Sequence, residues 1–122
     1  MKSGDSMPLI NFKLYKDNEK YYDLKDIDAF FEDNIIKFLI EDINMSFELQ
    51  EYGCIFTREN DEFRFILDVI EQQATYLLKE TNTLLDIIVE RCNFKRRKDI
   101  IVIEYQLETD DCINKIELEI GE

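Results

Sequence analysis

ENDEFRFILDVIEQQATYLLK, residues 59–79, is the segment on which the predicted fold class depends. Its apolar side chains follow helical spacing, at Phe63, Ile66, Leu67, Ile70, Ala74 and Leu77. Thr57 or Asn60 can cap the first turn. Acidic residues lie favourably at the positive end of the helix dipole, namely Glu59, Asp61 and Glu62. The sequence therefore predicts one long helix over about 59–79.

Alternating apolar and polar residues predict strands on the N-terminal side of this helix. Residues 9–15 and 43–50 both alternate with a period of two, and Gly53 ends the second strand. Residues 24–33 carry apolar side chains three and four positions apart, which predicts a shorter helix. Residues 34–40 fit either a helix or a strand, and the alternation within them favours a strand.

The last third of the chain predicts three further strands. Apolar residues alternate within 85–89, 101–107 and 116–120. Polar turns at 93–98 and 108–111 separate them, as in an antiparallel meander. The predicted fold class is α+β, with an antiparallel β-sheet or open sandwich of about five to six strands packed against one long helix and one shorter helix.

The length and composition predict a single domain. A chain of 122 residues can bury one modest core, and its three glycines and one proline leave no evident linker. We expect residues 1–7 to form a flexible N-terminal tail and residues 8–122 to form the α+β domain, with Met1 or Met7 as the natural start. No apolar run approaches the ~20 residues of a membrane span, so we expect a cytoplasmic protein.

The chain is strongly acidic. Its 28 Asp and Glu residues outnumber its 15 Lys and Arg residues, which leaves a formal net charge of −13 with no histidine. Such a field repels nucleic acid and anionic membranes, and it speeds encounter with cationic surfaces. We therefore expect a basic protein partner, with no direct binding to nucleic acid or membrane. Acidity that only maintains solubility is the simpler alternative.

The residue types present argue against most catalytic sites. Nucleophilic catalysis usually needs a base with a pKa near neutrality, which histidine supplies, and this chain has none. Three cysteines without CxxC spacing suggest neither zinc nor a disulfide framework. Asp23 is interpreted as a helix cap and not as a metal ligand. We predict no catalytic residue, no metal and no cofactor, while a pair of carboxylates in a small enzyme remains a further alternative.

Acidic residues gather in and around the predicted connections, where a partner could reach them. The candidate partner-binding carboxylates are Glu32, Asp33, Glu41, Asp42, Glu59, Asp61, Glu62, Asp110 and Asp111. The aromatic candidates beside such connections are Tyr21, Tyr22 and Phe94. One basic cluster, residues 95–98, lies in a predicted turn. It is either a solvated turn that blunts sheet-edge pairing or a contact for a phosphate or an acidic patch.

The segment DNIIKFLIEDINMSFELQEYGCIFTRENDEFRFILDVIEQ, residues 33–72, resembles immunity proteins of bacterial polymorphic toxin systems, in particular those guarding against wall-associated or Rhs-type toxins. In that family a strand pair, a short Cys-aliphatic-x-Thr turn and an amphipathic helix precede a β-hairpin. Residues 54–57 and the helix from Glu59 fit this order, and strands 84–91 and 99–108 supply the hairpin.

This resemblance implies a cytosolic antitoxin that binds one cognate toxin domain and blocks its active site. Many such toxins are nucleases, whose basic clefts suit an acidic inhibitor. A phage-type nucleic-acid mimic that inhibits a host defence nuclease would use the same electrostatics and is the principal alternative.

Overall fold

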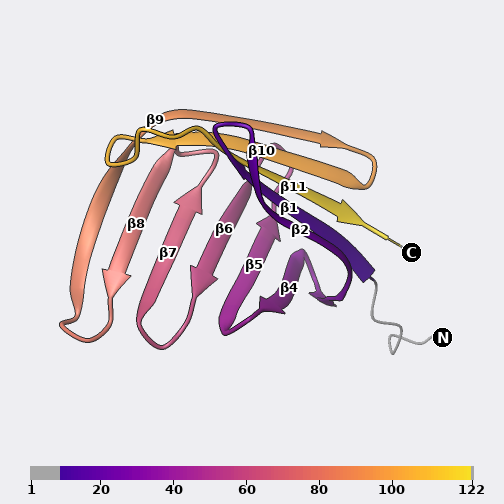
Figure 1. The fold of residues 1–122 in the computed structure, drawn as a ribbon, viewed down its shortest axis with the longest axis horizontal. Coiled ribbons are helices and arrows are strands. Elements are labelled where there is room, and N and C mark those ends of the chain that lie inside the picture. Colours follow the sequence, from indigo (N-terminus) through magenta and orange to yellow (C-terminus); the bar gives the residue numbers. More distant parts are fainter. Residues whose placement is uncertain (1–8, 122) are drawn as a thin grey trace.

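Residues 9–121 are the part of the chain that the computed structural model describes, and its regular elements are all strands (Figure 1). The strands are β1 (Leu9–Lys16), β2 (Glu19–Asp28), β3 (Phe30–Glu32), β4 (Ile35–Ile40), β5 (Ile43–Leu49), β6 (Cys54–Glu59), β7 (Phe63–Asp68), β8 (Gln73–Leu78), β9 (Thr83–Arg97), β10 (Ile100–Leu107) and β11 (Asn114–Ile120). The predicted tail, residues 1–7, lies outside the described residues.

All the strands join one antiparallel sheet in the order β2-β1-β11-β10-β9-β8-β7-β6-β5-β4-β3. The first half of β9 pairs with β8 and the second half pairs with β10. Figure 1 shows that the sheet folds over along this 15-residue strand. Layer A contains β10, β11, β1 and β2, and layer B contains β3 to β8. The strands of the two layers cross at a large angle.

The core lies between the two layers because the inward residues of nearly every strand are apolar. In β1 these are Ile10, Phe12 and Leu14, and in β10 they are Ile101, Ile103, Tyr105 and Leu107. Aromatic pairs join the layers: the Phe12 and Phe38 ring centroids are 5.4 Å apart, and those of Phe65 and Tyr105 are 6.4 Å apart. Each fully buried Phe contributes about 1.5–3 kcal/mol through burial.

The predicted long helix over 59–79 is wrong, because this segment contains β7, a turn and β8. Phe65 and Leu67 are 5% and 0% exposed, whereas Ile70 is 50% exposed. The Asp68 carboxylate accepts hydrogen bonds from the backbone N–H groups of Ile70 and Glu71, both at 3.1 Å, and so closes the turn. The alternation Phe63-Phe65-Leu67 therefore determines the structure, and the helical spacing is coincidental.

The predicted shorter helix over 24–33 is also wrong, because these residues form the end of β2 and all of β3. Asp26 has a φ of 56° where β2 bulges, and its N–H donates to Asn11 Oδ1 at 3.0 Å. The bulge shifts the alternation along β2, which produces the spacing of three that resembles a helix. Buried Ala29 alone separates β2 from β3, at opposite edges of the sheet.

The strands predicted over 9–15 and 43–50 are confirmed, as is the preference for a strand within 34–40. The C-terminal antiparallel meander is also confirmed. Its first turn is misplaced, because β9 continues to Arg97 and the chain turns at residues 98–99. The fold class α+β is wrong. A second layer of the same sheet covers the core where the prediction placed a helix.

Candidate functional site

An acidic edge is formed by three neighbouring hairpin turns of layer B. The turns between β4 and β5, β6 and β7, and β8 and β9 leave the sheet at the same end, because consecutive strands are antiparallel neighbours. Two strand spacings of about 4.8 Å place adjacent turns about 10 Å apart. We define the acidic edge by its exposed carboxylates, Glu41, Asp42, Asp61, Glu62 and Glu80.

Hydrogen bonds hold the turns of the acidic edge in place. The Asn60 side-chain oxygen accepts from the backbone N–H groups of Glu62 at 2.8 Å and Phe63 at 3.1 Å. The backbone N–H of Lys79 donates to the Glu62 carbonyl at 3.0 Å, which joins two of the turns. These contacts present the carboxylates on a fixed backbone, so little conformational entropy is lost when a partner binds.

Tyr22 connects the acidic edge to layer A. Its hydroxyl donates to a Glu41 carboxylate oxygen at 3.1 Å. Burial raises the pKa of Tyr22, and the hydrogen bond to Glu41 raises it further. Tyr22 therefore remains a neutral donor, and it links β2 to the turn after β4.

Glu59 lies in β6 beside the acidic edge, where its charge is already paired. Its carboxylate accepts from Arg64 at 2.9 Å and lies 2.7 Å from the Lys79 ammonium. Hydrogen bonds from Arg64 and Lys79 hold the pKa of Glu59 below its ordinary value. Glu59 is thus ionised but neutralised, unlike the exposed carboxylates of the turns.

The remaining candidates lie away from this edge. Glu32 and Asp33 are at the turn between β3 and β4, on the opposite end of layer B. Asp110 and Asp111 follow β10 in layer A. Phe94 is half-buried within β9 and packs against the core.

Tyr21 is the most exposed of the aromatic candidates, at 57%, and the Lys16 ammonium lies 5.5 Å from its ring centroid. The structure therefore brings together Glu41, Asp42, Asp61 and Glu62, with Tyr22 behind them.

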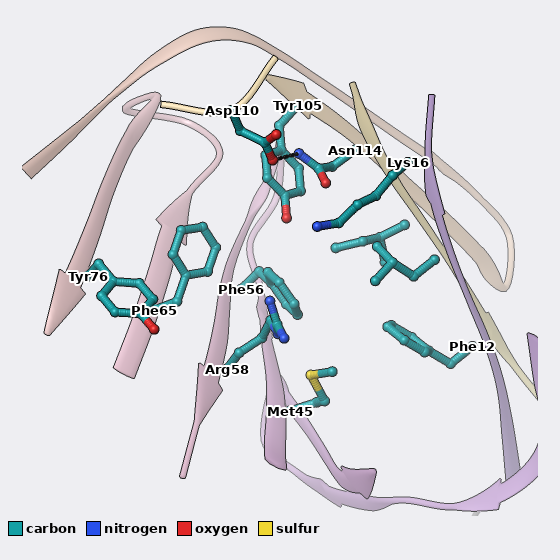
Figure 2. Close-up of a pocket in the computed structure, with 12 residues that line it drawn as sticks. Phe12, Lys16, Met45, Phe56, Arg58, Phe65, Tyr76, Tyr105, Asp110 and Asn114 are labelled. Carbon is teal, nitrogen blue, oxygen red and sulfur yellow. Dashed lines mark hydrogen bonds between the residues drawn. The ribbon is translucent and has the colours of Figure 1, made fainter. Parts of the chain in front are cut away.

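A second site is a cavity of about 100 Å³ between the layers. Its apolar walls are formed by Phe12, Leu14, Met45, Phe56, Phe65 and Ile116. Its polar groups come from Lys16, Arg58, Tyr76, Tyr105, Asp110 and Asn114. Figure 2 shows the polar ends of Lys16, Arg58 and Tyr105 directed into the same central space. We call this the inter-layer cavity.

Arg58 is the residue of the inter-layer cavity with an unfulfilled hydrogen-bonding group. Its Nε is buried and has no hydrogen-bond partner among residues 9–121. The guanidinium carbon lies 5.8 Å from the Phe63 ring centroid, which supplies a cation–π contact only. A buried unsatisfied donor costs about 1–3 kcal/mol, so a ligand that accepts from it is favoured.

Tyr105 and Asp110 complete the electrostatics of the inter-layer cavity. Burial raises the pKa of Tyr105 to about 12, so its hydroxyl stays neutral and can donate. Burial alone would raise the pKa of Asp110, but hydrogen bonds from Cys112 and Asn114 hold it below its ordinary value. The ionised Asp110 carboxylate already accepts hydrogen bonds from Cys112 and Asn114, which lie in or next to the loop between β10 and β11.

Arg58 and Lys16 were not among the functional residues predicted from the sequence. Each continues an inward apolar series: Cys54 and Phe56 precede Arg58 in β6, and Phe12 and Leu14 precede Lys16 in β1. A charge at an inward strand position is the signal that could have identified them. For Arg58 the predicted helix from Glu59 hid this signal, because the strand was expected to have ended.

No protein-family model, curated protein or solved structure matches this chain. The resemblance of residues 33–72 to immunity proteins stays a prediction. The structure contradicts the predicted turn and helix on which the resemblance partly rested. Residues 54–57 lie within β6, and the hairpin of β7 and β8 follows them where a helix was expected. Within residues 9–121, no helix has the length and apolar character needed to cross a membrane.

Proposed function

We propose that this protein binds a basic protein partner through the acidic edge and thereby blocks that partner's cationic surface, as an immunity protein does to a toxin. The proposal includes a cytoplasmic location, where such a partner would be neutralised before it acts. The acidic edge is the observation that carries it. Five exposed carboxylates follow one line of hairpin turns in a chain of net charge −13.

The geometry of the acidic edge is suited to filling a basic cleft of the partner, of the kind that otherwise binds a polyanion. Adjacent turns are spaced by about 10 Å, and each can present one or two carboxylates to lysine and arginine side chains. Rigid turns favour binding because little order has to be imposed on association. The overall negative field would also steer the partner, so association should be fast at low ionic strength and slower when salt is added.

The test compares two variants of equal net charge. The edge variant reverses four carboxylates of the acidic edge: Asp42→Lys, Asp61→Lys, Glu62→Lys and Glu80→Lys. The matched variant reverses four exposed carboxylates at or near the opposite turns of layer B: Glu32→Lys, Glu48→Lys, Glu51→Lys and Glu71→Lys. Glu41 is left unchanged because Tyr22 donates to it.

The partner is captured from a lysate of the source cell on immobilised wild-type protein, and it is then identified and purified. Its binding to both variants is then measured by surface plasmon resonance at low and physiological ionic strength. We expect the edge variant to lose about 100-fold or more in affinity, since several charge pairs are reversed together, and the matched variant to lose less than about tenfold. Equal affinities for the two variants, or a captured partner without a basic surface, would refute the proposal.

A further inference from the structure

We propose that the inter-layer cavity is a binding site for a small amphipathic carboxylate, with its apolar tail between the layers and its carboxylate held by Arg58 and Lys16. This site is separate from the acidic edge. The acidic edge attracts positive charge, whereas the inter-layer cavity attracts negative charge. The inference does not depend on the proposed protein partner.

The charge of the inter-layer cavity selects an anion. Lys16 and Arg58 both contribute a cation, whereas Asp110 contributes the one carboxylate among the lining residues. Asp110 already accepts from the Cys112 backbone N–H at 3.2 Å and from the Asn114 amide at 3.4 Å. Arg58 forms no ion pair with any residue of 9–121. One positive charge therefore remains unneutralised inside a protein that is otherwise strongly acidic.

The donors of the inter-layer cavity suit a carboxylate in particular. Arg58 Nε is a buried N–H without a partner among the described residues, and a carboxylate oxygen is the strongest acceptor that it could meet. Figure 2 shows the Lys16 ammonium and the Tyr105 hydroxyl directed toward the same space. Three donors from three different strands would thus converge on two carboxylate oxygens.

The walls of the inter-layer cavity suit a short apolar tail. Phe12, Phe56 and Ile116 are each 1% exposed or less, and their side chains form part of the apolar wall of the cavity. A cavity of 150 Å³ holds a benzene ring, so about 100 Å³ holds an aliphatic tail of roughly three to five carbons. Butyrate and pentanoate have the required size, whereas octanoate is too long to be enclosed.

Backbone hydrogen bonds hold the end of β1 next to Lys16 in a defined position. The backbone N–H of Asp17 donates to the Ile113 carbonyl at 2.9 Å, and the Ile113 N–H donates to Asp17 Oδ1 at 2.9 Å. These bonds fix the end of β1 against the connection before β11. Lys16 immediately precedes Asp17, so the position of its backbone is set before a ligand arrives.

The test measures binding of butyrate and pentanoate to the full chain by isothermal titration calorimetry and by the NMR signal of the Arg58 Nε–H group. We expect dissociation constants in about the millimolar range, because ligands of this size have few atoms to contribute. We also expect a shift of the Arg58 signal on saturation. Butanamide and butylamine, which share the tail but lack the negative charge, should bind at least about tenfold more weakly.

Two variants test the assigned residues. Arg58→Met and Lys16→Met should each weaken butyrate binding by about tenfold or more. Lys13→Met is the matched control, because it removes the same charge from the outer side of β1 and should bind butyrate as the wild type does. Thermal unfolding of each variant verifies that it is folded.

Three outcomes would overturn the inference. The first is that neither butyrate nor pentanoate binds or shifts the Arg58 signal. The second is that folded Arg58→Met and Lys16→Met variants both keep the wild-type affinity, which places the anion elsewhere. The third is a wrong ligand preference. If butanamide binds as well as butyrate, the charge assigned to the cavity is wrong. If octanoate binds and butyrate does not, the size assigned to the cavity is wrong.

Discussion

Arg58 and Glu59 are neighbours in β6, and their environments differ because successive strand residues point to opposite sides of a sheet. Arg58 points between the layers into the cavity, where its Nε lacks a partner among the described residues. Glu59 points outward and is paired with Arg64 and Lys79. The same strand thus provides one charge available to a ligand and one that stabilises the fold.

The pairing of Glu59 predicts a pH-dependent contribution to stability. Its pKa in the folded protein lies below the ordinary value near 4.5, because Arg64 and Lys79 donate to it. The ionised form is therefore favoured by folding, and the contribution is fully present above pH 4.5 and lost as pH falls through the folded pKa. Glu59→Gln should lower the free energy of unfolding by about 0.5–1 kcal/mol at pH 7 and by much less at pH 3.

Urea denaturation of wild type and Glu59→Gln at the two pH values measures this difference. Glu48→Gln is the control, because Glu48 is exposed and has no ion pair among residues 9–121. Its effect should be small at both pH values. A Glu59→Gln effect that is the same at pH 3 and pH 7 would show that the ion pairs do not stabilise the protein.

The hairpin of β7 and β8 shows why part of the fold could not be predicted from sequence. Phe63, Leu67 and Ala74 fit helical spacing, and Phe63, Phe65 and Leu67 fit alternation as well. Short apolar runs are compatible with both periods, and the deciding contacts come from strands distant in sequence. Phe65, for example, packs against Tyr105 in the other layer. In 9–15 and 43–50 only the period of two fits, and these strands were predicted correctly.

The two interpretations of this hairpin differ in which side chains support the core. In the structure Phe65 is 5% exposed and Ile70 is 50% exposed, whereas the helical pattern gave Ile70 a core position. Phe65→Ala should therefore lower the free energy of unfolding by about 3–5 kcal/mol. Ile70→Ala should lower it by about 1 kcal/mol or less, since only part of its surface is buried.

Chemical denaturation monitored by circular dichroism provides both values. Ile66→Ala is an internal control, because Ile66 adjoins Phe65 in β7 but points outward and is half-buried. Its effect should be intermediate. A larger loss for Ile70→Ala than for Phe65→Ala would contradict the strand assignment.

The net charge of −13 acts on the molecule as a whole, because unscreened carboxylates repel one another in the folded state. Raising the salt concentration from about 10 mM to about 150 mM shortens the screening length from about 30 Å to about 8 Å. We therefore expect the unfolding temperature of the isolated protein to rise with salt. The matched variant with Lys at positions 32, 48, 51 and 71 should show a smaller rise, because it carries less negative charge.

Differential scanning fluorimetry across a sodium chloride series tests this expectation. An unfolding temperature that falls over this range would show that attractive ion pairs outweigh repulsion.

The charge, unlike the fold, could be read directly from the sequence, and so could the positions of Asp42 and Asp61 in connections. Their assembly into one edge could not be predicted, because it depends on the adjacency of β4 to β9.

β1 pairs with β11, so that Ile10 lies opposite Ile120. A ribosome releases the chain from its N-terminus, and residues 9–16 emerge long before their partner at 114–120 has been synthesised. The hairpin of β1 and β2 must therefore wait with one side of β1 unpaired until residues 114–120 have been synthesised. Pairing between strands that are about 100 residues apart in the sequence also makes folding slow. Deletion of the last strand should leave this hairpin exposed to self-association or to proteolysis during synthesis.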